Sequence, residues 1–168
     1  MALVLGQHVD RSFYEFDHRF EELPAPTQAP ARKLIAYWRK CEALDGMRMG
    51  RDIPSRALAS LLTHIMVFEP FANWQDAYVR YAGFGTAKYF GRDVTGLLYS
   101  ELEAGDRSGT LRQLLRETRD MVAENRCRVL DHRALDSGVE VSRQELVTVP
   151  IFGPDGKRGW FLSAAFDL

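Results

Sequence analysis

The sequence has only two cysteines in 168 residues, and they lie too far apart to form a metal or redox motif. Cys41 and Cys127 have neither CxxC nor CxxCH spacing. This excludes a zinc ribbon, a thioredoxin-type dithiol and covalent attachment of a c-type haem. Two free thiols are typical of a protein kept in a reducing compartment. We therefore expect a cytoplasmic protein.

The chain also lacks an excess of positive charge and a long apolar run. Its 22 basic and 23 acidic residues give a net charge of −1, so no positive surface is expected to hold a nucleic acid. No apolar stretch approaches the roughly 18–20 residues that cross a bilayer. The apolar residues 2–5 are too few for the core of a signal peptide. We expect neither membrane insertion nor a nucleic-acid partner.

The first 30 residues differ from the rest in composition. Residues 12–16 and Phe20 are mostly aromatic, and Pro24, Pro26 and Pro30 follow them. Because proline fixes φ and restricts the residue before it, these residues predict an extended linker. We interpret residues 1–30 as an arm with a proline-rich linker, and residues 31–168 as one domain. The aromatic content predicts that the arm docks on its own domain or on a neighbouring subunit.

The hydrophobic pattern predicts a mixture of helices and strands. Apolar residues recur at spacings of three and four over residues 31–44, which indicates an amphipathic helix. Asp52 and Pro54 indicate the start of a second short helix that reaches residue 65. A further short helix is expected over 86–90, and a long one over 109–126 with Ser108 or Thr110 as its N-cap. Strands are predicted over residues 65–71, 78–84, 128–135, 145–152 and 160–166.

This order of elements predicts an α+β fold with a five-stranded antiparallel sheet and helices on one face. Five short blocks narrow the interpretation: AYWR at 36–39, DIP at 52–54, RYAG at 80–83, FGRDVTG at 90–96 and VPI at 149–151. With the element order, they make residues 31–168 resemble the PAS-like family of small alphaproteobacterial regulatory proteins. The resemblance implies a PAS fold preceded by an N-terminal helix and an arm.

The resemblance also implies a function in signal transduction. Such a stand-alone sensory module acts through protein–protein interaction, with a kinase or another regulator as partner, and has room for a small ligand. PAS modules often form a homodimer through the helix that precedes the first strand. In this chain that helix is 31–44, and Leu34, Tyr37 and Trp38 are the candidate interface residues.

Two further groups of residues are candidates for a site or for scaffold. A ligand pocket is expected between the sheet and the helices over residues 86–122, although ordinary core packing would explain the same apolar side chains. The candidate walls are Tyr89, Phe90, Leu98, Leu111, Leu115 and Met121. Arg80 and Asp93 are predicted to form an ion pair that fixes a loop, and Gly91 and Gly96 suit backbone with positive φ.

The sequence gives little support for catalysis or for a cofactor. Cys127 follows the long helix, whereas the flavin-binding cysteine of light-sensing PAS relatives precedes it. Residues 109–126 contain no histidine that could ligate haem, and His132 is interpreted as an exposed strand residue. The nucleophile motif G-x-S-x-G is absent. We expect a protein that is not an enzyme and that holds neither a metal nor a cofactor.

Two alternatives to a signalling module stay open. A small cone-shaped α+β enzyme of the ketosteroid-isomerase type would carry an acidic or phenolic pair inside its cavity. A purely structural oligomerisation domain would share every feature above and differ only in lacking a regulated partner.

Overall fold

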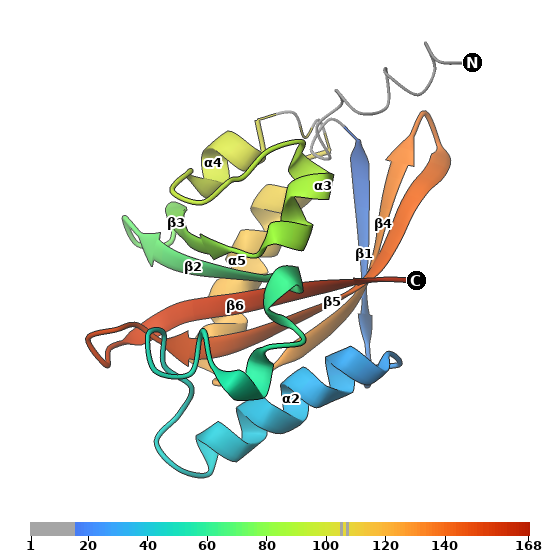
Figure 1. The fold of residues 1–168 in the computed structure, drawn as a ribbon. Helices are drawn as coiled ribbons and strands as arrows, with labels where there is room; N and C mark the ends of the chain where they lie inside the picture. The colour runs from blue at the N-terminus through green and yellow to red at the C-terminus, as the bar shows by residue number, and fades with distance from the viewer. Residues whose placement is uncertain (1–15, 105, 107) are drawn as a thin grey trace.

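A computed structural model describes residues 16–104, 106 and 108–168, which form an α+β fold around one antiparallel sheet (Figure 1). The strands lie in the order β1-β4-β5-β6-β2-β3. Their bounds are β1 (Asp17–Leu23), β2 (Ile65–Phe71), β3 (Asp76–Ala82), β4 (Arg128–Asp136), β5 (Val139–Phe152) and β6 (Arg158–Asp167). The predicted class is confirmed. The predicted number of five strands was wrong, because the described residues form a sheet of six strands.

The extra strand comes from the segment predicted as an arm. β1 pairs antiparallel with β4, and the register places Phe20 opposite His132. The predicted boundary at residue 30 would leave this strand outside the domain whose sheet it joins. The arm residues 1–15, with the aromatic run that begins at residue 12, lie outside the described residues.

Helices cover both faces of the sheet, so the expectation that they lie on one face was wrong. α2 (Ala29–Glu42) packs on one side, and α3 (Ala87–Phe90), α4 (Tyr99–Leu102) and α5 (Thr110–Ala123) lie on the other (Figure 1). Successive residues of a strand point to opposite faces, so β5 supplies both cores. Val147 and Val149 face α2, whereas Leu146 and Thr148 face the α5 side. A hydrophobic pattern shows that a strand is buried, but it does not show that both faces are covered.

α2 is held by its apolar stripe and by two contacts from β5. Leu34 is 0 % exposed, and burying such a side chain contributes about 1.5–3 kcal/mol. The indole Nε1 of Trp38 donates to the carbonyl of Pro150 at 2.8 Å. The backbone N–H groups of Thr27 and Gln28, just before the helix, each donate to the buried carboxylate of Glu145 at 2.7 Å. The apolar stripe of α2 that the sequence predicts is therefore buried in the core of the same chain.

The second predicted helix does not form. In its place are two 3-10 turns, η2 (Arg56–Leu58) and η3 (Leu62–His64), and a third, η4 (Phe84–Thr86), precedes α3. Asp52 does not cap a helix. Its carboxylate accepts hydrogen bonds from the backbone N–H of Arg48 at 2.8 Å and from the Arg51 guanidinium at 3.0 Å. Asp52 therefore closes a loop, and the apolar residues after it fill the core from separate turns.

The N-cap of α5 also differs from the prediction. Gly109 occupies the cap position, and its φ of 71° is left-handed. The N–H of Leu111 donates to the carboxylate of Asp106 at 2.9 Å, which satisfies one of the first free donors of the helix. Asp106 stands three residues before the cap, so the usual cap spacing does not predict it.

Candidate functional site

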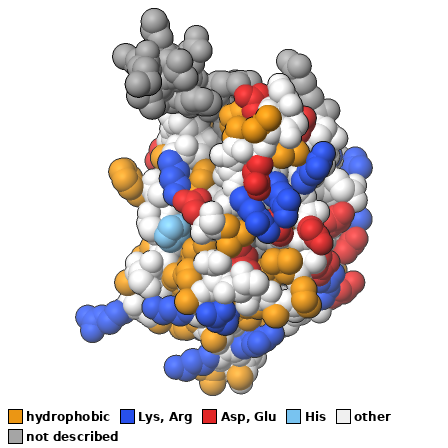
Figure 2. All heavy atoms as spheres, turned by 90° about the vertical axis from the view of Figure 1, so that its right-hand side faces the viewer, with side chains coloured by type: hydrophobic (Ala, Val, Ile, Leu, Met, Phe, Trp, Pro, Cys, Tyr) orange, Lys and Arg blue, Asp and Glu red, His pale blue; other side chains and the backbone are white. Residues whose placement is uncertain are grey.

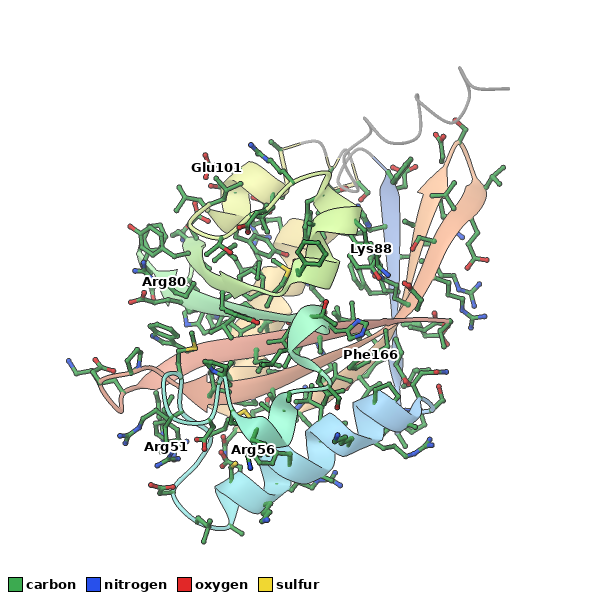
Figure 3. The ribbon with its side chains drawn as sticks, in the orientation of Figure 1. Arg51, Arg56, Arg80, Lys88, Glu101 and Phe166 are labelled. Carbon is green, nitrogen blue, oxygen red and sulfur yellow. The ribbon has the colours of Figure 1, made fainter. Side chains whose placement is uncertain are left out.

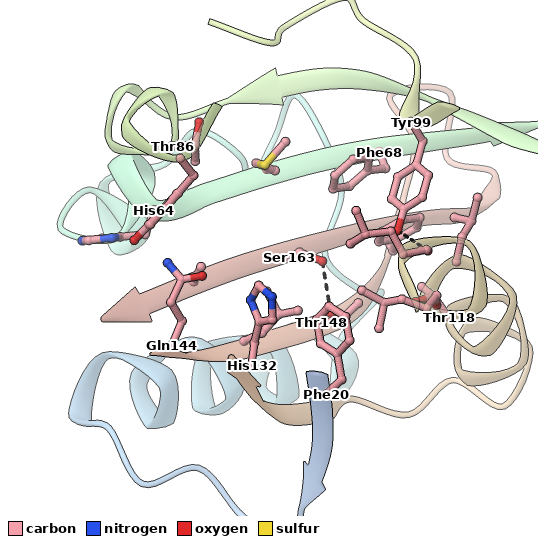
Figure 4. A pocket seen from close by; sticks show the side chains of 18 of the residues that line it. Phe20, His64, Phe68, Thr86, Tyr99, Thr118, His132, Gln144, Thr148 and Ser163 are labelled. Carbon is pink, nitrogen blue, oxygen red and sulfur yellow. Dashed lines mark hydrogen bonds between the residues drawn. The ribbon is translucent and has the colours of Figure 1, made fainter. Parts of the chain in front are cut away.

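A cavity of about 100 Å³ lies between the sheet and the helices on the α5 side (Figure 4). One wall comes from α3 and α5, and the other from β2, β4, β5 and β6, with Phe20 of β1 at one end. Its aromatic and polar lining residues are Phe20, His64, Phe68, Thr86, Tyr89, Phe90, Tyr99, Thr118, His132, Gln144, Thr148, Phe161 and Ser163; Met66, Leu111, Leu114, Leu115, Leu146 and Ala165 complete it.

The structure places four of the six predicted pocket residues at this cavity. They are Tyr89, Phe90, Leu111 and Leu115. Met121 is fully buried but lies one turn of α5 beyond Thr118, outside the lining. Leu98 forms a β-bridge with Tyr78 at the edge of β3. It therefore lies at the edge of the sheet and does not line the cavity.

The apolar part of the lining is built from stacked rings. Phe68 stacks on Phe161 with ring centroids 4.8 Å apart. The ring of Trp74 also stacks on Phe161, with centroids 5.7 Å apart. Phe20 stacks on His132 at 4.4 Å, with the two ring planes 9° apart. These flat rings give the cavity apolar walls, which suit a small apolar guest.

Hydroxyl groups line the sheet side and the α5 side of the cavity. Thr148 and Ser163 on neighbouring strands are hydrogen-bonded at 3.0 Å, and both side chains lie on the cavity floor (Figure 4). Thr118 donates to the carbonyl of Leu114 at 2.7 Å and accepts from the Arg128 guanidinium at 3.2 Å, so lone pairs for a guest come mainly from Thr148 and Ser163. The cavity can therefore accept a hydrogen bond from a guest while most of its surface stays apolar.

Two histidines meet at the β1 end of the cavity. His132 is 4 % exposed, and its Nε2 lies 3.0 Å from Nδ1 of the buried His18. Burial, followed by the charge of His18, lowers the pKa of His132 to about 3, while hydrogen bonding with Gln144 acts in the opposite direction. The expectation of an exposed His132 was wrong. The signal was present: Leu130 and Ala134, two residues away on either side, are buried and share its face.

Comparison with known proteins identifies the family. A family model described as a PAS domain matches residues 27–164. The chain belongs to the PAS domain family. No curated protein and no solved structure matches it.

Most strands and helices of this PAS domain fall inside the matched segment, and β1 falls outside it. The blocks that carried the resemblance take separate positions in the fold. AYWR lies on α2, RYAG ends β3, FGRDVTG connects α3 to α4, and VPI crosses β5 under α2. Phe90 of FGRDVTG lines the cavity, whereas AYWR and VPI lie on the α2 side of the sheet.

The cavity is closed at one side by α3, which is tied to the end of β6. Tyr89 donates to the carboxylate of Asp167 at 2.6 Å, and Lys88 donates to the same carboxylate at 2.6 Å. Burial and the hydrogen bond to Asp167 raise the pKa of Tyr89 to about 12. Gln144 also donates to Asp167, at 3.3 Å. Figure 3 shows Lys88 beside this end of the sheet. These bonds position α3 over the cavity.

The predicted ion pair between Arg80 and Asp93 was wrong. Arg80 donates to Glu69 on β2 at 2.5 Å, and Figure 3 shows it at the outer edge of the sheet. Asp93 instead accepts from the N–H of Thr95 at 2.9 Å. An ion pair between Arg80 and Asp93 depends on how the loop folds against the strand, and the sequence does not show that.

The two loop glycines have the backbone that was expected. φ is 70° at Gly91 and 87° at Gly96, both in the left-handed region. The N–H of Gly96 donates to Val79 and the N–H of Val79 donates to Leu97. This loop therefore covers the outer edge of β3.

The candidate interface residues on α2 are largely occupied within the chain. Leu34 and Trp38 are buried against the sheet, and Tyr37 is half-buried against the same core. The Tyr37 hydroxyl lies 3.5 Å from Asp52. A direct subunit contact through Leu34 or Trp38 would require α2 to leave its own sheet.

Cys127 lies outside the cavity and packs beside the core on the α2 side, and both cysteines are free. Among residues 16–104, 106 and 108–168, no group of three or more histidine, cysteine or acidic side chains is arranged to bind a metal ion. Within the same residues, no helix is both long enough and apolar enough to cross a bilayer.

Proposed function

We propose that this PAS domain is a sensory module that takes up a small, mostly apolar molecule in the cavity between the sheet and α5. The observation that carries the proposal is the cavity itself. Its aromatic walls are stacked and its hydroxyl floor is hydrogen-bonded, so the space is preformed. A volume of about 100 Å³ is in the range of a guest with a handful of heavy atoms, since an apolar protein cavity of about 150 Å³ binds benzene.

The residues around the cavity favour binding over catalysis. The lining offers imidazole, amide and hydroxyl groups, and no carboxylate occurs among its described residues. An enzyme of the ketosteroid-isomerase type would carry an acidic or phenolic pair inside the cavity. The lining has two phenols, Tyr89 and Tyr99, and their hydroxyls already donate to Asp167 and to the Leu111 carbonyl. The proposal is therefore a binding module located in the cytoplasm, where its two free thiols would be kept reduced.

We propose that the occupied state is transmitted to a signalling protein, such as a kinase or another regulator. Phe84 is 93 % exposed and lies two residues before Thr86, which lines the cavity. Gly83 and Gly85 hold the turn close to η3: an added Cβ at Gly83 would lie 2.1 Å from the Leu62 carbonyl oxygen. The tight turn presents Phe84 outward. An exposed aromatic beside the ligand site is a suitable anchor for a partner.

Ligand binding is tested with a matched pair of variants. Benzene-sized aromatic compounds, with and without a hydroxyl group, are titrated into the protein and followed by calorimetry and native mass spectrometry. Ser163→Leu fills the floor of the cavity and is expected to abolish binding. Thr148→Val removes a hydroxyl at nearly constant volume and is expected to retain most of the apolar binding. Equal binding to the wild type and to Ser163→Leu would show that the cavity is not the site.

The partner contact has its own test. Affinity capture with the wild type and with Phe84→Ser is expected to give a signalling protein that only the wild type retains. Direct binding of that purified protein is then measured by titration, with Leu44→Ser as the control, because Leu44 is equally an exposed apolar residue but lies far from the cavity at the end of α2. Equal affinity for the wild type and Phe84→Ser would contradict the proposed contact.

A further inference from the structure

β1 is an outer strand of the sheet, and it lies outside the segment that matches the PAS family. Its inner edge pairs with β4 over Asp17–Leu23. Among the described residues no strand, bridge or backbone hydrogen bond occupies its outer edge. The opposite edge of the sheet differs, because the Gly96 loop hydrogen-bonds to Val79 and covers β3. With respect to residues 16–104, 106 and 108–168, β1 therefore presents unpaired backbone donors and acceptors, which favour the addition of another strand.

Two charged side chains of β1, Arg19 and Glu21, form no ion pair with another described residue, whereas Glu22 pairs with Arg126 at 3.2 Å. Arg19 and Glu21 are exposed and lie on the same face. The register places Arg19 opposite Arg133 and Glu21 opposite Asp131 on β4. Like charges directly opposite one another do not stabilise a strand pair. Asp131 is already engaged by Arg143 at 2.7 Å and by Arg133 at 3.4 Å.

We propose that the outer edge of β1 pairs with β1 of a second copy of this chain, antiparallel and centred on Phe20. In this arrangement Arg19 of each copy lies directly opposite Glu21 of the other. The two-fold axis repeats the contact, so one strand pair contains two ion pairs. The charge pattern of one short strand thus makes the edge complementary to itself.

Neighbouring registers are disfavoured by the same charges. A pairing centred on Arg19 would place the two Arg19 side chains opposite each other, and Asp17 opposite Glu21. A pairing centred on Glu21 would oppose the two Glu21 side chains and leave Arg19 facing Leu23. The alternation of one basic and one acidic residue therefore selects Phe20 as the centre. Figure 2 shows that side chains of both signs are intermingled on the face of the molecule it draws.

The proposed pairing would join the two sheets into one continuous sheet, and each half of that sheet forms a wall of one cavity. Phe20 lines the cavity and stacks on His132 at 4.4 Å. Centring on Phe20 places this wall residue of each copy at the two-fold axis. The interface differs from one built on α2, where Leu34 and Trp38 are already buried.

A charge-exchange experiment on the full chain tests the proposal. The wild type, Arg19→Glu and Glu21→Arg are examined by sedimentation velocity from about 1 to about 200 µM. Each single variant carries two like charges on β1 and is expected to self-associate about tenfold more weakly than the wild type. A mixture of the two variants is expected to recover association as a heterodimer, because every cross-strand pair is then of opposite sign. Circular dichroism confirms that each variant is folded.

A control variant and the contrary results complete the test. Arg116→Glu changes an exposed charge on α5 that forms no ion pair in the described structure, and it is expected to associate like the wild type. A wild type that stays monomeric over the whole range would overturn the proposal. So would single variants that dimerise as strongly as the wild type, or a mixture that does not recover association.

Discussion

The buried histidine at the cavity makes the stability of this domain dependent on pH. His132 has a pKa of about 3 in the folded chain, against about 6.5 when it is solvated. As the pH falls below 6.5, the unfolded chain binds a proton that the folded chain does not bind. Stability is therefore present above pH 6.5 and is lost as the pH falls toward 3. Because only the unfolded chain binds this proton, His132 alone is expected to lower the free energy of unfolding by about 2–3 kcal/mol between pH 7 and pH 4.5.

The groups that surround His132 allow this contribution to be isolated. His18 lies against its ring, Gln144 hydrogen-bonds to it, and Asp131 is adjacent in sequence. Interaction with Arg143 holds the pKa of Asp131 below its usual value, so this carboxylate stays ionised down to pH 4.5. Between pH 4.5 and pH 6.5 the loss of stability therefore comes from histidine and not from Asp131.

Urea unfolding at pH 7.0, 5.5 and 4.5 measures the effect. The wild type is expected to lose stability steadily, at no more than about 1.4 kcal/mol per pH unit from this group. His132→Gln removes the titrating group and is expected to be less stable at pH 7 but to show a clearly shallower dependence on pH. Thr148→Val changes the same cavity without a titratable group, so it keeps the wild-type slope. Identical slopes for the wild type and His132→Gln would refute the reasoning.

Three further substitutions probe packing, a buried hydrogen bond and the closure of the cavity. Leu115→Ala removes a side chain that is 1 % exposed and should cost about 2–5 kcal/mol in denaturant unfolding; a loss below 1 kcal/mol would mean that the site collapses around the smaller side chain. Trp38→Phe removes the indole donor to a β5 carbonyl and should cost about 1–3 kcal/mol, whereas an unchanged unfolding midpoint would show that the bond contributes nothing. Asp167→Asn weakens the bonds to Lys88 and Tyr89 and should change global stability by less than about 1 kcal/mol, because the Lys88–Asp167 pair is half-exposed. Hydrogen exchange at residues 87–90 should nevertheless quicken in this variant, and unchanged exchange would contradict a role in holding α3.

Sequence reasoning located several walls of the cavity but not its floor or its end. Leu111 and Leu115 share the apolar stripe of α5, and that stripe faces the cavity. Thr148 and Ser163 carry no such signal, because a hydroxyl in a strand is equally common on an exposed face. Phe20 was assigned to an arm, and its role follows only from the pairing of β1 with β4.

The elements that could be predicted from the sequence are those whose signals are local. The period of α5, the strand character of β2 and the need for a left-handed backbone at Gly91 and Gly96 all depend on residues within one or two turns. The order of the elements and the short blocks between them were sufficient to indicate a PAS domain, which the family match confirms. Local spacing is sufficient because helix and strand periods are fixed by backbone geometry.

The contacts between groups that are distant in the sequence could not be predicted, because they depend on how the whole chain packs. His18 and His132 are 114 positions apart, and Glu145 accepts from the backbone of Thr27 across 118 positions. Arg80 was predicted to pair with Asp93, but the pairing of β2 with β3 brings it to Glu69. A period of two tells which residues share a face of a strand, but it does not specify the neighbouring strand, the register or what covers that face. Those are set by the packing of the whole sheet between α2 and α5, and with them the cavity and the open edge of β1.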